Sequence, residues 1–354
     1  MKLIALKDVC KINMGQSPNS SSYNDYGDGM PFFQGNADFG ERYPITRVWC
    51  NTPTKIAQAE DILISVRAPI GALNYAKEEC CIGRGLAAIT PDRNKVSQDF
   101  IYWALKGKKA ELNDKGNGST FKAISRKVLE ETMIPDINFE QQHKCAENLE
   151  KIYGIIQNRR KELLALDDLI KARFVEMFGD PIINSKHLET KELKDILILK
   201  AGDFTAASDI ADEPSEFNPY PCYGGNGIRG YVVEYNQEGE YSLVGRQGAL
   251  SGNVQFASGK FKNTEHALLV TPIVEMNCIW LNQLLVNLDL KRYQTGAAQP
   301  GVSVKNLQEI KILCVSIDEQ KAFADFVRQV DKSKLMFQKL HQKLNILRQK
   351  AGNI

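Results

Sequence analysis

Two long stretches of the chain place apolar residues at alternating three- and four-residue steps. In residues 139–178 these positions are Leu149, Ile152, Ile156, Leu163, Leu166 and Ile170. From Asp318 onward they are Phe323, Phe326, Val330, Phe337, Leu340, Leu344 and Leu347. This spacing is typical of a helix with a coiled-coil seam. Gly179 and Pro181 follow the first stretch, and a glycine followed by a proline ends a helix.

Each predicted helix needs a partner. A helix of about 40 residues spans about 60 Å, which is too long for the inside of one compact domain. A single amphipathic helix with so thin an apolar stripe is not stable alone. The two stretches are therefore expected to pair within the chain as an antiparallel coiled coil.

The segments outside the two helices form a repeat. DILISVRAPIGALNYA in residues 1–138 corresponds to EYSLVGRQGALSGNVQFA in residues 183–317. ISRKVLEETMIP and VSVKNLQEIKIL then align without a gap, with Leu129 and Leu307 178 residues apart. Conserved order over several segments indicates a duplicated unit. The prediction is an α+β fold with pseudo-two-fold symmetry: mixed α/β modules at 1–138 and 183–317, and spacer helices at 139–180 and 318–354.

The composition is that of a soluble globular protein. Of its 354 residues, 43% are hydrophobic and 25% are charged. No apolar run reaches the ~18 residues that a membrane span needs, and the N-terminus does not resemble a signal peptide. The eight cysteines are scattered, which is typical of a cytoplasmic protein with reduced thiols. The net charge of +2 does not by itself indicate nucleic-acid binding, so any such function needs local basic groups.

Two similar modules joined by a stiff, antiparallel helix pair would present the same face twice at a set separation. That geometry matches two separated half-sites of duplex DNA. Arginine suits guanine, asparagine and glutamine suit adenine, and lysine and serine suit phosphates. The candidates in the first module are Gln34, Asn36, Arg67, Arg84, Lys115, Asn117, Ser119 and Lys122. Those in the second are Tyr223, Asn226, Arg229, Arg246, Gln247, Lys262, Asn263, Gln294, Thr295 and Gln299.

Taken singly, each of these residues is more often a solvated or turn-capping side chain than a base contact. Repeated placement is what favours DNA binding. Arg67 and Arg246 follow equivalent predicted strands and form the preferred pair, although an arginine there could also clamp a phosphate or brace its own loop.

Catalytic motifs are not found. Residues 225–230 match GxGxxG, but a β-like segment follows instead of the helix that a dinucleotide site requires, so a turn is predicted. Residues 35–40 have P-loop spacing but continue with Glu41 and Arg42. No HExxH or GxSxG motif occurs, and the four histidines lie far apart. The sequence thus predicts no catalytic residue and no metal site in this chain.

The segments ISRKVLEETMIPDINFEQQ, VSVKNLQEIKILCVSIDEQ and LIKARFVEMFGDP resemble the specificity subunit of Type I restriction–modification systems. The resemblance covers essentially the whole chain. It implies two target recognition domains that each read half of a bipartite DNA site, with the helices setting the gap. It also implies two methyltransferase (modification) subunits carrying S-adenosylmethionine, and restriction subunits that use ATP and magnesium. This chain would then be non-catalytic and would hold no cofactor.

Two alternatives stay open from the residues. A stand-alone DNA nuclease would need clustered carboxylates, and Asp203, Asp209 and Asp212 are loosely grouped. A helical scaffold that binds other proteins would need no base readout.

Overall fold

The computed structural model describes residues 2–118, 122–296 and 300–352, with side chains up to Met336. The chain divides into two compact units. Unit 1 comprises Met1–Arg159 and Lys339–Ile354, and unit 2 comprises Arg160–Gln338. The division falls inside helix α5 (Phe139–Phe178), which contributes to both units. Helix α9 spans Ile317–Gly352.

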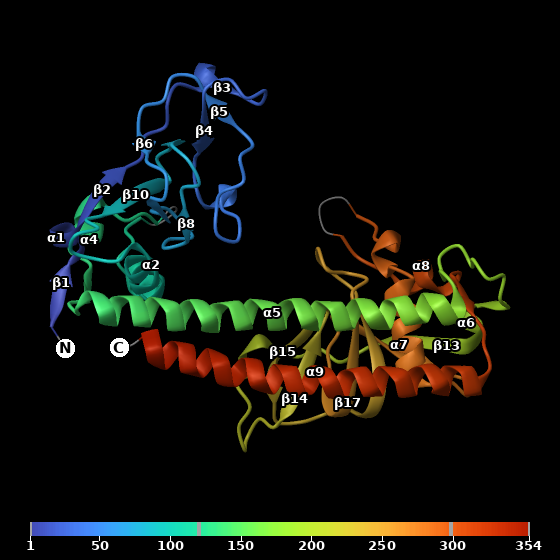
Figure 1. The fold of residues 1–354 in the computed structure, drawn as a ribbon. Coiled ribbons are helices and arrows are strands. Elements are labelled where there is room, and N and C mark those ends of the chain that lie inside the picture. Colours follow the sequence, from blue (N-terminus) through green and yellow to red (C-terminus); the bar gives the residue numbers. More distant parts are fainter. Residues whose placement is uncertain (1, 119–121, 297–299, 353–354) are drawn as a thin grey trace. The chain divides into compact units, whose positions relative to one another are not determined.

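In the described part of unit 1, an antiparallel sheet of order β2-β10-β7-β8 lies beside a mixed sheet of order β3-β5-β4-β9-β6, and β1 pairs with β11 (Figure 1). The strands are β1 Leu3–Ala5, β2 Cys10–Met14, β3 Tyr23–Asn24, β4 Met30–Phe33, β5 Trp49–Cys50, β6 Ile56–Ala57, β7 Ile62–Ser65, β8 Leu73–Tyr75, β9 Cys80–Ile82, β10 Leu86–Pro91 and β11 Met133–Pro135. The helices are α1 Leu6–Val9, η1 Ser20–Ser22, η2 Asn36–Asp38, α2 Gln98–Gly107, α3 Lys109–Asp114 and α4 Arg126–Glu130.

The main core of unit 1 lies between the β2-β10-β7-β8 sheet and α2. Alternate residues of β7 face it, so Ile62 and Ile64 belong to this core while Leu63 belongs to a second cluster. Helix α5 joins the same core through Ala146, with Leu149 packed against it. One face of the first half of α5 thus packs against the core of this unit.

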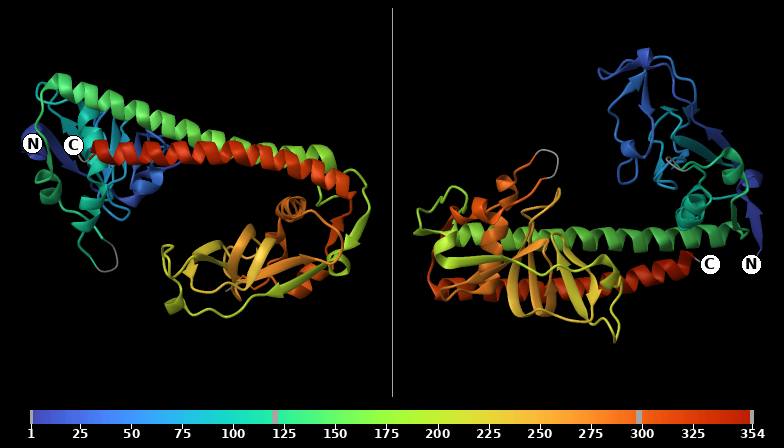
Figure 2. Two further views of the ribbon diagram at one scale, coloured as in Figure 1. Left: turned by 90° about the horizontal axis from the view of Figure 1, so that it is seen from below. Right: turned by 180° about the vertical axis from the view of Figure 1, so that it is seen from behind.

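In the described part of unit 2, the sheet has the order β13-β18-β16-β17-β14-β15, and β12 pairs with β19. The strands are β12 Thr190–Glu192, β13 Leu197–Ala201, β14 Tyr220–Gly224, β15 Gly227–Val232, β16 Gln237–Gly245, β17 Val254–Asn263, β18 Ala267–Pro272 and β19 Lys311–Leu313. The helices are α6 Leu193–Ile196, η3 Ala207–Asp209, α7 Cys278–Asn287, η4 Leu290–Tyr293 and α8 Val304–Gln308. Helix α7 lies between this sheet and the long helices (Figure 2).

The second half of α5 packs against the first half of α9 within unit 2. Phe174 and Phe323 are fully buried with ring centroids 5.4 Å apart, and Phe178 contacts both Phe323 and Trp280 of α7. Further along, Lys334 forms an ion pair with Asp167 at 2.7 Å. Contacts shift backward on α5 as they move forward on α9, so these two segments are antiparallel.

The predicted seam positions have mixed burial. Ile156, Ile170, Phe323 and Val330 are buried, whereas Leu149, Ile152, Leu163, Leu166 and Phe326 are partly exposed. The side chains of Phe337, Leu340, Leu344 and Leu347 lie outside the described residues. Phe174 and Phe178 were not among the predicted positions, because they follow Ile170 at steps of four residues and leave the heptad pattern. Phe178 also contacts Trp280 of α7.

Module 1 denotes residues 1–138, and module 2 denotes residues 183–317. The duplication of the two modules extends to individual backbone hydrogen bonds. Leu6 N donates to Thr132 O at 2.9 Å, and Leu193 N donates to Ile310 O at 2.8 Å. Strand β10 pairs with β2 and β7 as β18 pairs with β13 and β16. The repeat seen in the sequence is therefore a repeat of topology.

A buried glutamine joins each module to its long helix. Gln142 Oε1 accepts from Ser97 N at 2.7 Å, and its Nε2 donates to Ile137 O at 2.8 Å. In unit 2, Gln320 makes the equivalent bonds to Asn277 N (2.8 Å) and Val315 O (3.0 Å). Each pair of bonds connects the start of α2 or α7 to the first turn of a long helix.

Candidate nucleic-acid interface

Loops that follow the central strands of module 1 are tied together by backbone hydrogen bonds. Gly85 N donates to Gln34 O at 3.1 Å, and Val66 N donates to Gly85 O at 2.9 Å. The approach requires glycine, because a Cβ at residue 85 would lie 2.4 Å from Gln34 O. Arg84 and Gln34 are consequently held next to the end of β7 with exposed side chains.

A second set of backbone bonds adds the loop before α4. Arg67 forms an isolated bridge with Ala123, which also pairs with Asn117 through two bonds of 2.9 Å. Ala68 N donates to Lys122 O at 3.0 Å. We call the resulting surface loop edge 1; it comprises Gln34, Arg67, Arg84, Asn117 and Lys122, all exposed. Asn36 lies two residues from Gln34, at the start of η2, and is half-buried. Ser119 lies outside the described residues.

Module 2 builds the same surface. Arg246 N donates to His266 O at 2.9 Å, and Gln247 bridges to Gly301, which pairs with Thr295. Gly248 N donates to Pro300 O at 2.8 Å, as Ala68 N does to Lys122 O in module 1. We call this surface loop edge 2; it comprises Arg246, Gln247, Glu265, His266 and Thr295. Gln299 lies outside the described residues.

The hydrogen-bond register corrects the preferred arginine pair. Ile124 N donates to Val66 O at 2.9 Å, and Val302 N donates to Arg246 O at 2.8 Å. Arg246 therefore corresponds to the buried Val66, and Arg67 corresponds to Gln247. Ser65 and Gly245 hold the same register on β7 and β16, so the match of Arg67 with Arg246 by residue type was one residue out. Arg246 Nη1 donates to Glu265 O at 3.0 Å, so this guanidinium braces its own loop edge.

Other candidates occupy the hairpin β14–β15. Residues 225–226 form its turn, as predicted for the GxGxxG segment, and Asn226 Oδ1 accepts from Asn253 Nδ2 at 3.2 Å. Gly225 lies against loop edge 2, since a Cβ there would be 3.1 Å from His266 O. Arg229 is exposed on β15, whereas Tyr223 is half-buried against Phe261.

Several candidates have structural roles instead. Asn263 is only 1% exposed and its N–H donates to Asn236 Oδ1 at 2.7 Å, so its prediction as a DNA contact is wrong for this structure. Lys115 pairs with Glu111, Lys262 pairs with Asp203, and Gln294 donates to Ser251 O. A hydrogen bond from Asn236 and the nearby Lys262 lower the pKa of the Asp203 carboxyl.

Glu265 and His266 lie on loop edge 2, although the sequence did not single them out as candidates. They occupy the positions of Arg84 and Gly85 in module 1, since Leu86 and Ala267 hold the same register on β10 and β18. An alignment of the two modules over all strands of the sheet could have identified them as the counterparts of Arg84 and Gly85. Loop edge 1 is thus cationic, with Arg67, Arg84 and Lys122, whereas loop edge 2 combines Arg246 with a carboxylate, an imidazole and an amide.

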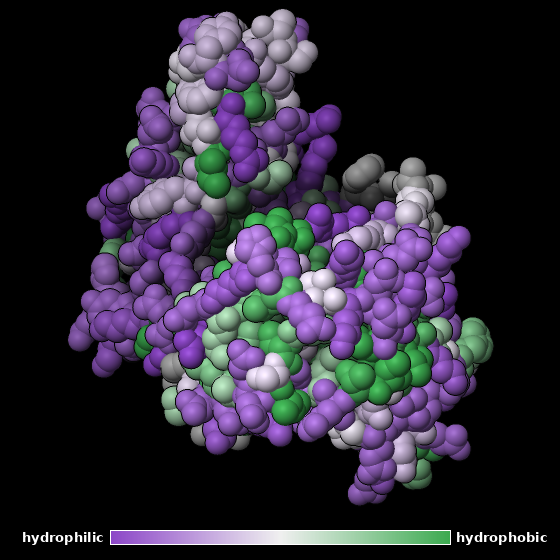
Figure 3. Space-filling model, turned by 90° about the vertical axis from the view of Figure 1, so that its right-hand side faces the viewer, coloured by the Kyte–Doolittle hydropathy of each residue, from purple (hydrophilic) through white to green (hydrophobic). Residues whose placement is uncertain are grey.

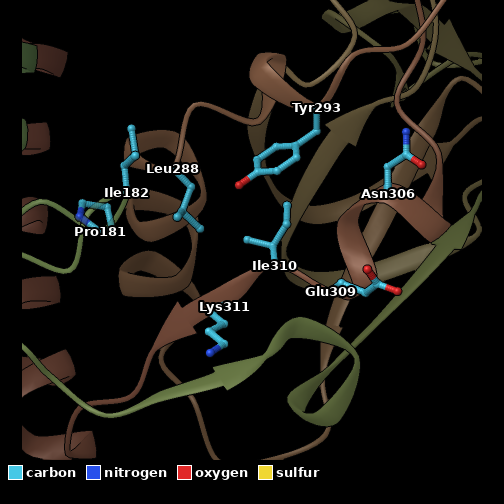
Figure 4. Close-up of a pocket in the computed structure, with 8 residues that line it drawn as sticks. All are labelled: Pro181, Ile182, Leu288, Tyr293, Asn306, Glu309, Ile310 and Lys311. Atoms are coloured by element: carbon cyan, nitrogen blue, oxygen red, sulfur yellow. The ribbon is translucent and has the colours of Figure 1, made fainter.

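A pocket of about 370 Å³ in unit 2 is lined by Pro181, Ile182, Leu288, Tyr293, Asn306, Glu309, Ile310 and Lys311. The Tyr293 ring points into the same space as Leu288 and Ile310 (Figure 4). None of the predicted DNA contacts lines it. Across the described residues, no group of three or more His, Cys, Asp or Glu side chains could hold a metal ion, and no helix is long and apolar enough to cross a membrane.

Apolar residues form patches among hydrophilic ones on the face drawn in Figure 3. In unit 2 the exposed apolar side chains include Ile182, Ile183, Ile198, Ile273, Val274 and Val286. Ile183 is 72% exposed. Contiguous apolar patches on a protein surface often mark contacts with other macromolecules.

Fold and site together define a duplicated α+β protein with two copies of one loop surface, each carrying a different set of polar side chains. Residues 1–166 and 185–347 match the family model described as the Type I restriction modification DNA specificity domain. The chain belongs to this family.

Two curated relatives carry names from the same family. The putative type I restriction enzyme MjaX specificity subunit of Methanocaldococcus jannaschii is 47% identical over 152 residues, which is 43% of this chain and 36% of that protein. The EcoprrI specificity subunit of Escherichia coli is 40% identical over 158 residues, covering 44% of this chain and 39% of that protein. The matched region therefore spans less than half the length of each relative.

The crystal structure of a Type I restriction–modification S subunit from M. genitalium has the same fold. It superposes with a TM-score of 0.63 and 18% sequence identity, covering 99% of this chain and 94% of that one.

Proposed function

We propose that this chain recognises a bipartite DNA sequence as the specificity subunit of a Type I restriction–modification enzyme, with each module reading one half. The observation that carries this proposal is the duplicated loop edge. The backbone register is the same in both modules, but Arg67, Arg84 and Gly85 are replaced by Gln247, Glu265 and His266. A retained scaffold with exchanged polar side chains suits two readers of different base sequences, because base edges are distinguished by donor and acceptor pattern.

The helices α5 and α9 would form an antiparallel coiled coil that sets the gap between half-sites. The contacts between Phe174 and Phe323 and between Asp167 and Lys334 support antiparallel pairing within unit 2. We extend this pairing to the outer parts of both helices, which would relate the modules by a pseudo-two-fold axis. A stiff spacer then permits few gap lengths, whereas a flexible linker would permit many.

The partners would be two modification subunits, which bind S-adenosylmethionine and methylate the DNA, joined by restriction subunits that use ATP and magnesium. The exposed apolar side chains of unit 2 support a protein-docking role. This chain would contribute no catalytic residue and hold no cofactor or metal of its own. It would act in the cytoplasm, bound to double-stranded DNA.

Methylome sequencing of cells that express this chain with its modification subunits tests the proposal. We expect one bipartite methylated sequence with a constant gap. Exchanging residues 1–138 for the equivalent module of another specificity subunit should change one half of that sequence and leave the other half intact. A contiguous methylated sequence, or an unchanged one after the exchange, would count decisively against it and favour the scaffold alternative.

Insertions test the spacer separately. Adding four residues to both helices, at the Arg159–Arg160 and Gln338–Lys339 junctions, adds about one turn and about 6 Å. We expect the gap to lengthen by about two base pairs, at about 3.4 Å each, with both half-sites preserved. Four alanine substitutions at exposed positions of the same turns provide the control of unchanged length. A methylated sequence whose gap stays the same after insertion would refute the spacer role.

A further inference from the structure

Three side chains of loop edge 2 form a linked chain. His266 Nε2 lies 3.1 Å from Glu265 Oε1, and His266 Nδ1 lies 3.3 Å from Gln247 Oε1. Glu265 and His266 follow β17, whereas Gln247 follows β16, 19 residues away from His266 in sequence. Gln247 is exposed, so the chain runs from a partly buried carboxylate to an amide at the surface.

The backbone holds all three residues in place. Arg246 N donates to His266 O at 2.9 Å, and Arg246 Nη1 donates to Glu265 O at 3.0 Å. Gln247 is fixed on its other side by the bridge to Gly301. The side chains therefore meet on a rigid frame, as a readout residue requires.

The chemistry of the pair sets the proton on the ring. An ionised carboxylate only accepts hydrogen bonds, so Glu265 requires that Nε2 carry a hydrogen. The second carboxylate oxygen, Oε2, is buried and has no hydrogen-bond partner among the described residues, and His266 Nε2 is the ion-pair partner of Oε1. In the neutral ring Nδ1 must then accept, and in the charged ring it donates.

The state of Nδ1 decides the orientation of the Gln247 amide. A neutral ring accepts from Nε2 of Gln247 and turns Oε1 toward solvent. A charged ring donates to Oε1 and turns the amide nitrogen outward, and in the structure Oε1 is the atom beside Nδ1. An outward Oε1 suits the amino groups of adenine or cytosine, whereas an outward NH₂ group suits the acceptors of guanine or thymine.

We propose that Gln247 reads a base in the half-site of module 2, and that Glu265 and His266 are positioning residues that select which amide atom faces that base. This inference rests on the proposed function. Other charged groups around the chain are Arg246 after β16, Arg229 on β15 and Lys262 at the end of β17. Arg229, Lys262 and Glu265 all act electrostatically on the nearby Cys222.

Module 1 is the internal control. Its residues at the positions of Gln247, Glu265 and His266 are Arg67, Arg84 and Gly85, and a glycine cannot supply a ring. Histidine changes its charge between about pH 5 and about pH 8. A pH-dependent base preference is therefore expected in the half-site of module 2 and not in the half-site of module 1.

The test is selection of bound duplexes from a random-sequence DNA library by the complete complex with its modification subunits, at about pH 5.5 and about pH 8. Wild-type protein should change its preference at one base pair of one half-site between the two conditions. Gln247→Ala should remove the discrimination at that base pair, which is about 5- to 150-fold for a well-made contact. His266→Phe should abolish the pH response at the same position, and Glu265→Gln, which no longer forces the hydrogen onto Nε2 of the neutral ring, should reduce it.

Unchanged selection of the half-site of module 1 shows that each variant is folded. Glu234→Gln, at an exposed position before β16, is the matched charge control. If wild-type protein selects no bipartite sequence, the proposed function fails. If it does, and Gln247→Ala keeps the wild-type preference, only this inference fails. If Gln247→Ala relaxes the base pair but Glu265→Gln and His266→Phe keep the pH response, the positioning roles are overturned.

Discussion

Replacing the buried glutamine of module 1 should weaken the attachment of α2 to α5. Gln142 is 3% exposed, and its amide satisfies two backbone groups, Ser97 N and Ile137 O. Gln142→Ala removes both bonds. The effect should be local, because Ser97 is the N-cap of α2 and Ile137 precedes the first turn of α5.

The magnitude follows from the burial of the two groups. Ser97 is buried at 7% exposure, so its orphaned N–H costs about 1–3 kcal/mol. Ile137 O is nearer to solvent, and losing its bond costs about 0.5–1.5 kcal/mol because water replaces the donor. The sum is about 1.5–4.5 kcal/mol. For Gln320→Ala we expect about 1–3 kcal/mol, since both Asn277 and Val315 are half-buried.

Amide hydrogen exchange resolves the two units better than a single unfolding curve, because a chain with two units need not unfold in one step. In Gln142→Ala the amides of α2 should exchange about 10- to 2,000-fold faster, which corresponds to the free energy above. The amides of α7 should keep the wild-type rate. Gln320→Ala should show the reverse pattern.

Gln141→Ala is the matched control. Gln141 is exposed on the same turn of α5, so its replacement should change stability by less than about 0.5 kcal/mol. Equal amide exchange rates of α2 in Gln142→Ala and Gln141→Ala would refute the role of Gln142 in attaching α2 to α5. A larger increase in amide exchange in α7 than in α2 after Gln142→Ala would show that the hydrogen bonds of Gln142 do not stabilise α2.

Three further predictions concern the core, the thiols and loop edge 2. Phe323→Ala should lower the stability of unit 2 by about 3–5 kcal/mol in urea denaturation, because it opens a cavity among buried aromatic rings. Met336→Ala, at a position 62% exposed, should have little effect on stability. Similar losses of stability in the two variants would contradict the buried packing of Phe323. Burial, with Asp92 nearby for Cys10 and Asp61 for Cys80, raises both thiol pKa values to about 12. Iodoacetamide at pH 8 should therefore leave Cys10 and Cys80 unmodified until urea is added. Labelling of either thiol faster than the half-exposed Cys145 would contradict their burial. Arg246→Ala, which removes the hydrogen bond that braces loop edge 2, should weaken binding only at the half-site of module 2, by about 1–3 kcal/mol, in competition between duplexes altered in one half. Equal loss at both halves would assign Arg246 a general supporting role.

The long helices could be predicted closely from the chain. The first was expected over 139–178, and α5 spans Phe139–Phe178; the second was expected from Asp318, and α9 begins at Ile317. Apolar spacing and a glycine–proline stop are local signals, and they act within a few residues. The aromatic contacts of Phe174 and Phe178 were missed because their partners Phe323 and Trp280 lie about 100 to 150 residues further along the chain.

The individual members of the loop edges were harder to predict. Asn263 is a residue type that suits a DNA contact and yet is buried, at a position where β17 pairs with β14 and where Asn236 accepts its N–H. Arg246 follows the expected strand, but its register differs by one residue from Arg67. Both outcomes depend on hydrogen bonds between strands that are distant in sequence, and periodicity along one segment cannot reveal them.

The sequence by itself determined the duplication, the two long helices and the membership of the family, because each is written in local spacing or in repeated order. Only the tertiary structure decided which side chains of the two modules occupy equivalent places, and that Glu265, His266 and Gln247 meet. The physical reason is that sheet register, set by hydrogen bonds across the fold, places residues from separate loops within bonding distance.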